Sequence, residues 1–246
     1  KSAMDYTFLN RAYSSLHAAT FENMNAILTD YAITQEMISS EKQRIDTTAY
    51  ETNIHYPTDS SLLWDSFRTL SRLVSTIKHE LPLLDLQHRF HDGKVKKLAI
   101  FIARNASSKR KNTQREVKSR YATLIDRVRW IHGVGQDVLK KAFAAGYTVV
   151  ELSHYLPLVE RIVDQAHRRI ILGEKVPTYE KLYSLFEEHT ELSIRGKAGK
   201  PIEFGHKILL AQTGEKYIHH YNVIKKQIND KDPLLPASGA HKEMFG

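Results

Sequence analysis

A short β-prone run stands far from any other strand signal in this chain, and that separation constrains the fold more than any other feature. Residues 43–55 include six β-branched or aromatic side chains, Ile45, Thr47, Thr48, Tyr50, Thr52 and Ile54, and Pro57 ends the run. The next β-prone residues are 204–212 and 217–224, which flank a turn at 213–216 and predict an antiparallel hairpin. A single strand leaves its N–H and C=O groups unpaired. We therefore expect the first run to pair with the distant hairpin.

Helical periodicity dominates the rest of the chain. Residues 3–35 repeat apolar side chains at three- and four-residue steps. A second helix is predicted to begin at 58–60, where Thr, Asp or Ser can accept the first free N–H groups. Residues 84–173 remain helical in pattern, and Asp232-Pro233 predicts the cap and first turn of a last helix. Breaks in the long helical stretch are predicted near Gly93, 106–109, Gly133–Gly135 and Gly146.

These elements predict a helix-rich α/β chain of the α+β kind. An N-terminal helical segment is expected at 1–40, and residues 41–57 and 183–246 are expected to form the part that contains the sheet. Residues 58–182 would then be a basic, all-helical insertion between the strand at 43–55 and the hairpin at 204–224.

The composition favours a polyanionic partner and excludes several other kinds of site. The 246 residues include 36 Lys and Arg against 28 Asp and Glu, a net charge of +8, and phosphate groups are natural partners of such an excess. Cysteine is absent, which excludes disulfides and thiolate zinc sites and fits a cytoplasmic protein. No apolar run approaches the roughly 18 residues of a membrane span, so no membrane partner is expected.

Asp46 is the candidate metal ligand in the first β-prone run. It alternates with Ile45 and Thr47, so it should lie on the opposite face of the strand from them. Two Mg²⁺ ions about 3.5–4 Å apart can activate water and stabilise a leaving oxygen, but they need carboxylates from several elements. A structural aspartate at a strand end or turn is the alternative. Glu51 and Asp59 are nearby acids, with a solvated side chain and a helix cap as their ordinary roles.

A dense run of positive charge is the candidate DNA-binding surface. Between positions 93 and 120 the only acid is Glu116, against ten bases, and contact with phosphates is the natural use of such a run. The ten bases are Lys94, Lys96, Lys97, Arg104, Lys109, Arg110, Lys111, Arg115, Lys118 and Arg120. An ordinary solvated helical hairpin is the alternative. Aromatic residues are few here, so the pattern does not indicate base stacking.

Three further cations, Arg195, Lys197 and Lys200, lie in a glycine-containing run. Its glycine spacing is too short for a phosphate-binding P-loop, and Pro201 stands where that loop has Ser or Thr. We expect a flexible basic loop that can touch a DNA backbone.

The histidines do not predict a metal site. His88 and His91 are three residues apart, whereas His219 and His220 are adjacent on a predicted strand and should point to opposite faces. We therefore expect structural or surface roles for them. Gly133-Val134-Gly135 lacks the third glycine and the preceding strand of a dinucleotide-binding site.

Two blocks of this sequence resemble a group of bacterial insertion-sequence transposases of the Asp-Asp-Glu type. The first follows Asp46-Thr47-Thr48 and reads Thr52-Asn53-Ile54-His55-Tyr56-Pro57-Thr58-Asp59-Ser60-Ser61-Leu62-Leu63. The second comprises Leu185-Phe186-Glu187-Glu188-His189-Thr190-Glu191-Leu192 and Arg195-Gly196-Lys197-Ala198-Gly199-Lys200-Pro201-Ile202-Glu203-Phe204-Gly205-His206-Lys207. The blocks stand in the family's order on either side of the helical insertion, and the match covers most of residues 41–246.

The resemblance implies a ribonuclease H-like core with an Asp, Asp, Glu triad that holds two Mg²⁺ or Mn²⁺ ions. Asp46 matches the first aspartate, while the segments that carry the second aspartate and the glutamate would follow Gly246. The chain is therefore expected to be a transposase fragment, inactive alone, with an incomplete core. The implied partner is double-stranded DNA, both element ends and target, in the bacterial cytoplasm at the nucleoid. A homo-oligomer is also expected.

Two other functions are compatible with the same residues. A non-catalytic DNA-binding remnant of a mobile element would keep the basic surface without the chemistry. A helical scaffold would have no role with nucleic acid, and it would not bind DNA at about 50 mM salt, where phosphate contacts are strong.

Overall fold

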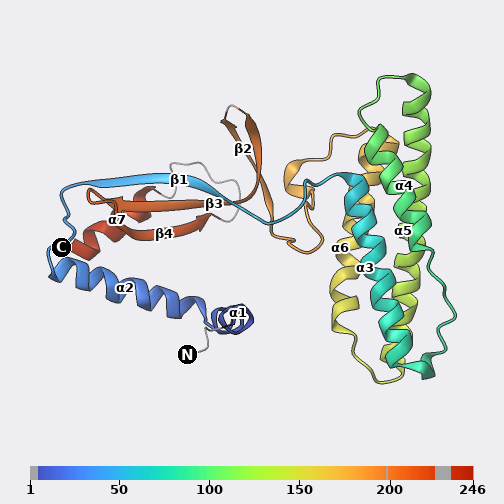
Figure 1. The fold of residues 1–246 in the computed structure, drawn as a ribbon, viewed down its shortest axis with the longest axis horizontal. Helices are drawn as coiled ribbons and strands as arrows, with labels where there is room; N and C mark the ends of the chain where they lie inside the picture. Colours follow the sequence, from blue (N-terminus) through green and yellow to red (C-terminus); the bar gives the residue numbers. More distant parts are fainter. Residues whose placement is uncertain (1–4, 198, 225–233, 246) are drawn as a thin grey trace. The chain divides into compact units, whose positions relative to one another are not determined.

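The computed structural model describes residues 5–197, 199–224 and 234–245, except for the side chains of 195–197, 200 and 201. The chain divides into two compact units (Figure 1). One unit combines Lys1–Tyr50 with His206–Gly246, and the other is Glu51–Gly205. The elements are mixed helices and antiparallel strands, which confirms the α+β class.

The unit Glu51–Gly205 is a helical bundle with a small hairpin (Figure 1). Its helical elements are α3 (Asp59–Glu80), η1 (Pro82–Leu84), α4 (Asp92–Asn105), α5 (Lys111–Ala144), α6 (Val150–Ala166), η2 (His167–Leu172) and η3 (Thr178–Glu180). The η2 segment is a π-helix that continues directly from α6. The predicted helical insertion therefore consists of four main helices joined by short connections.

Helix α3 is the centre of this bundle and packs against α4, α5 and α6. Its apolar residues recur at three- and four-residue steps, and Leu63, Phe67 and Leu70 are completely buried. Leu62, Val74 and Ile77 complete the buried face that the periodicity predicts. Removing this stripe from water is the main source of stability for the unit.

The predicted break at Gly133–Gly135 is wrong, because α5 runs without interruption through both glycines. Gly135 is buried, and a Cβ atom there would lie 2.9 Å from Cδ2 of Leu156 on α6. Its missing side chain lets α5 and α6 approach closely. A glycine that reads as a helix break in the sequence is a packing contact in the structure.

A strand that the sequence analysis missed completes this unit. β2 (Glu191–Lys197) pairs antiparallel with β3 (Lys200–Thr213), with Leu192 opposite Phe204 and Ser193 opposite Glu203. The predicted flexible basic loop is therefore wrong, since Lys197 and Lys200 face each other at the end of a hairpin.

The other unit contains a sheet and three helices (Figure 1). Its elements are α1 (Tyr6–Ser14), α2 (Ala18–Thr34), β1 (Gln43–Glu51), the second half of β3, β4 (Ile218–Ile224) and α7 (Leu234–Phe245). β1 lies beside β3, and β3 pairs antiparallel with β4, so the predicted pairing between the first strand and the distant hairpin is confirmed. β1 ends at Glu51 rather than at residue 55. The predicted cap at Asp232-Pro233 lies outside the described residues.

A small apolar cluster holds α7 against this sheet. Leu209, Ala211 and Ile224 from the hairpin are buried with Ala237 from α7, and Ile45 from β1 packs on them. The Gln43 side chain donates to the backbone oxygen of Ala237 at 3.2 Å. The side of β1 that carries Gln43 and Ile45 is therefore covered by α7.

Helices α1 and α2 have the predicted periodicity but leave many apolar side chains exposed. Phe8 and Leu9 on α1 and Ile27, Leu28 and Tyr31 on α2 are more than half exposed. Among the described residues, no helix combines the length and the apolar character needed to cross a membrane.

His219 is the one buried histidine of the described residues, with 2% of its surface exposed. Its Nε2 lies 3.3 Å from Nδ1 of His241 on α7 and 3.5 Å from the Gln43 amide. Burial, and then the neighbouring His241 and His220, lower the pKa of His219 to about 4. The folded state therefore disfavours the protonated ring.

We predict that this unit loses stability as the pH falls from about 6.5 to about 4. In that window the unfolded chain binds a proton that the folded His219 rejects, a difference of roughly 2–3 kcal/mol. Hydrogen exchange of the β3 and β4 amides, measured between pH 7.5 and 4.5, should show the loss. His219→Gln should remove most of the pH dependence, and an unchanged profile in that variant would assign the effect to other groups.

Candidate nucleic-acid interface and the surroundings of Asp46

Asp46 lies on the open face of β1. Burial alternates along the strand, so Arg44, Asp46, Thr48 and Tyr50 are exposed while Ile45 points toward α7. The Asp46 side chain is 67% exposed, and its Oδ2 lies 3.6 Å from Nη2 of Arg44. Its Oδ1 accepts the N–H of Thr47 at 2.8 Å. The carboxylate is thus accessible, on the face predicted from the alternation.

Asp46 does not form a metal site with other described residues. No group of three or more His, Cys, Asp or Glu side chains gathers in the described part of the chain. One exposed carboxylate beside an arginine does not by itself fit a site for two divalent ions. No chemical step can be derived from Asp46 alone.

The ten predicted DNA-binding bases lie on α4, on α5 and in the connection between these helices. Lys94, Lys96, Lys97 and Arg104 lie on α4, Lys109 and Arg110 in the connection, and Lys111, Arg115, Lys118 and Arg120 at the start of α5. All ten are exposed. We call these ten residues the α4–α5 basic surface.

Almost all of the positive charge on this surface is uncompensated. Arg120 pairs with Glu116 at 3.2 Å and lies over the ring of Phe101. The other nine bases form no ion pair with any residue that the structure describes. Lys111, Arg115 and Lys118 recur at four- and three-residue steps and therefore share one face of α5.

The remaining predicted cations lie on the β2–β3 hairpin. The backbone of Arg195 and Lys197 belongs to β2, and that of Lys200 to β3. Their side chains are outside the described part of the structure.

The block at 52–63 begins a helix with a complete set of capping contacts. Thr58, rather than Asp59, is the N-cap, and its Oγ1 accepts the N–H of Ser61 at 3.1 Å. The Ser61 hydroxyl accepts the N–H of Thr58 at 3.0 Å. The hydroxyl of the buried Ser60 lies 3.2 Å from that of Thr58. Each of these residues thus has a structural partner.

Asp59 is a buried ion-pair residue that the sequence analysis treated as a helix cap. It is 6% exposed, and Nη1 of Arg169 on η2 donates to its two oxygens at 3.0 and 2.8 Å. Burial raises the pKa of Asp59, against the opposing charge of Arg169. A signal was present in the sequence: Asp59 precedes Leu62 and Leu63 by three and four positions, so it begins the apolar face and needs a partner there.

A second buried carboxylate, Asp65, ties the linker before α3 to the helix. Its oxygens lie 3.0 Å from Nη2 of Arg68 and 3.3 Å from Nε2 of His55. Burial raises its pKa despite these two partners. His55 and Asp59 both belong to the block that resembles transposases, and both make structural contacts, His55 with Asp65 and Asp59 with Arg169.

A cavity of about 140 Å³ adjoins the Asp59–Arg169 pair. Tyr56, Tyr183 and Phe204 line it, with the Phe204 ring 5.5 and 5.4 Å from the two tyrosine rings. Both transposase-like blocks therefore meet around this cavity within the unit Glu51–Gly205.

Comparisons of the chain with models of protein families, with curated proteins and with solved structures found no match.

We predict that the Asp59–Arg169 pair stabilises the bundle by far more than an exposed pair. Asp59→Asn should lower the free energy of unfolding by about 2–4 kcal/mol, because it leaves the Arg169 charge unpaired beside a buried amide. A double-mutant cycle with Arg169→Gln should give a coupling of about 1–3 kcal/mol. Urea unfolding followed by tryptophan fluorescence reports on this unit, because Trp64 and Trp130 both lie in it.

The control is the exposed pair Asp126–Arg129 on α5, with atoms 3.8 Å apart. Asp126→Asn with Arg129→Gln should couple by less than about 0.5 kcal/mol. Equal couplings in the two cycles would contradict the structural role of Asp59.

Proposed function

We propose that the chain is part of a bacterial insertion-sequence transposase of the Asp-Asp-Glu type and that the α4–α5 basic surface holds DNA. The observation that carries the DNA-binding part is the set of nine exposed cations without ion-pair partners among the described residues. Releasing counterions from DNA phosphates makes binding by such a surface favourable.

The catalytic part of the proposal rests on the resemblance and on the position of Asp46. Its carboxylate is exposed on β1, and β1 lies beside the β3–β4 hairpin. This arrangement supports the proposal of an incomplete ribonuclease H-like core. In this proposal Asp46 is one carboxylate of a triad for two Mg²⁺ or Mn²⁺ ions, and other segments supply the remaining two. These 246 residues alone are then inactive in DNA cleavage and strand transfer.

The proposed partners are the two element ends and the target DNA, at the nucleoid in the bacterial cytoplasm. The exposed apolar residues of α1 and α2 support a homo-oligomer.

A non-catalytic DNA-binding remnant of a mobile element is the second candidate. The pairing of Asp46 with Arg44 favours it, because an arginine beside the carboxylate competes with a metal ion.

We predict that reversing three charges on the α4–α5 basic surface abolishes tight DNA binding. In Lys111→Glu/Arg115→Glu/Lys118→Glu, the affinity for a duplex of about 30 base pairs should fall at least a hundredfold at about 100 mM salt. The slope of log K against log salt should shrink by about 2–3, one phosphate contact for each cation. Fluorescence anisotropy over a salt series measures both the affinity and its salt dependence.

The matched control is Arg127→Glu/Lys140→Glu/Lys141→Glu. These residues are exposed on the same helix, and the two lysines lie more than about 30 Å beyond Lys118 along it. Equal binding by the control and test variants would rule out this surface as the interface. Failure of the unaltered chain to bind at about 50 mM salt would favour the helical scaffold.

We predict that Asp46→Asn abolishes transposition without weakening DNA binding. In a transposition assay with the complete reading frame that contains these residues, the frequency should fall at least about a hundredfold, as expected for loss of a metal ligand. Tyr50→Phe, on the same exposed face of β1, is the control. Normal transposition by Asp46→Asn would refute its role, and no transposition by the unaltered protein would favour the remnant.

A further inference from the structure

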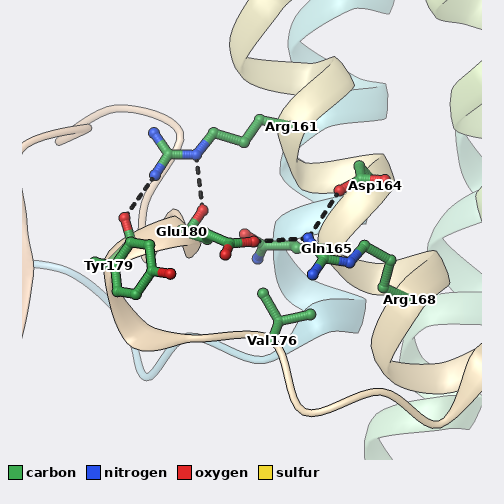
Figure 2. Close-up of a pocket in the computed structure, with 7 residues that line it drawn as sticks. All are labelled: Arg161, Asp164, Gln165, Arg168, Val176, Tyr179 and Glu180. Atoms are coloured by element: carbon green, nitrogen blue, oxygen red, sulfur yellow. Dashed lines mark hydrogen bonds and ion pairs between the residues drawn. The ribbon is translucent and has the colours of Figure 1, made fainter.

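Two adjacent arginines at the end of the bundle have opposite charge environments. Nε of Arg168 is 2.8 Å from Glu174, and its Nη1 is 2.7 Å from Glu180 and 3.5 Å from Asp164. Figure 2 shows Arg168 between Asp164 and Glu180. Arg169 faces a different way along η2 and has Asp59 as its carboxylate partner. Three carboxylates therefore surround the first arginine, and one the second.

The segment after η2 is firmly attached to α6. Arg161 donates to the backbone oxygens of Tyr179 at 3.4 Å and Glu180 at 2.9 Å (Figure 2). The buried Gln165 exchanges two hydrogen bonds with the backbone of Leu182, at 2.8 and 3.1 Å. These contacts hold the backbone on either side of Lys181, and the ion pair between Arg168 and Glu174 holds the residue before Lys175.

A cavity of about 320 Å³ opens beside Arg169, and Lys175 and Lys181 also line it. The one carboxylate in its lining, Glu174, already pairs with Arg168. Lys175 and Lys181 form no hydrogen bond or ion pair through their ammonium groups within the described ranges 5–197, 199–224 and 234–245. The cavity therefore has two positive charges that no described carboxylate neutralises by direct contact.

The electrostatic surroundings of Lys181 are consistent with the binding of an anion. Burial lowers the pKa of Lys181, Arg169 and Lys175 lower it further, and Asp59 opposes them. Like charges held together destabilise one another unless an anion lies between them. The π-helical turn that presents Arg169 is a local geometry often found at functional sites.

We propose that this cavity binds a phosphate group through Arg169, Lys175 and Lys181. A guanidinium and two ammonium groups around one cavity are the donors that phosphate oxygens accept most strongly. The phosphate comes from a DNA backbone or from a free phosphate ion. The assignment of the phosphate to DNA rests on the proposed DNA-binding function, whereas the phosphate site itself does not.

The test compares Lys175→Gln/Lys181→Gln with Lys140→Gln/Lys141→Gln, a matched neutralisation of two exposed lysines on α5. Isothermal titration calorimetry with inorganic phosphate is the first arm. The affinity should fall at least about tenfold in the first variant alone, since each lost charged hydrogen bond is worth about that factor. Unchanged thermal unfolding of both variants would show that the fold is intact.

Anisotropy of a labelled duplex of about 30 base pairs, at constant ionic strength, is the second arm. With DNA as the source, Lys175→Gln/Lys181→Gln weakens duplex binding at least about tenfold, and added phosphate competes. With free phosphate as the source, duplex binding is unchanged and only the calorimetric affinity falls. Equal results for the two variants in both arms would overturn the proposal.

The two proposals fail in different ways. If the unaltered chain binds inorganic phosphate at this cavity but no duplex, the phosphate site stands and the proposed DNA-binding function falls. If Lys111→Glu/Arg115→Glu/Lys118→Glu abolishes duplex binding and leaves the calorimetric affinity unchanged, the two sites are separate.

Discussion

The buried ion pair between Asp59 and Arg169 is the constraint on which the organisation of the unit Glu51–Gly205 depends. A carboxylate at the start of α3 is buried with the apolar face of that helix, and a buried charge requires a partner. Arg169 on η2, the segment that continues from α6, supplies this partner, and the ion pair orients η2. With Arg169 turned toward α3, Arg168 meets Asp164 of α6 and two carboxylates, Glu174 and Glu180, of the segment that follows η2.

This arrangement separates compensated from uncompensated positive charge. Arg168 and Arg169 have carboxylate partners and hold elements together, whereas Lys175, Lys181 and nine bases of the α4–α5 basic surface have none among the described residues. The compensated arginines contribute to the fold, the uncompensated cations are available to phosphate groups, and Arg169 does both in the proposed phosphate site. The transposase-like block at 52–63 also contributes to the fold, since His55, Thr58 and Asp59 make structural contacts.

Much of the fold was predictable because it follows from local patterns. The buried face of α3, the start of that helix at residues 58–60 and the pairing of β1 with the distant hairpin each follow from periodicity, capping chemistry or unpaired backbone groups. β2 was missed, since its alternation is short and ends in a glycine- and lysine-rich stretch that reads as a loop. Gly135 was misread because a helix break and a close helix contact call for the same residue.

The sequence by itself determined the helices, the two principal strand regions and the exposure of the basic surface, because each depends on residues near one another in the chain. Only the tertiary structure decided which charges are neutralised. Asp59 and its partner are 110 residues apart, and Lys181 gathers with Arg169 and Lys175 only after the segment that follows α6 folds back onto it. Burial and charge pairing arise between distant segments, so no local pattern specifies them.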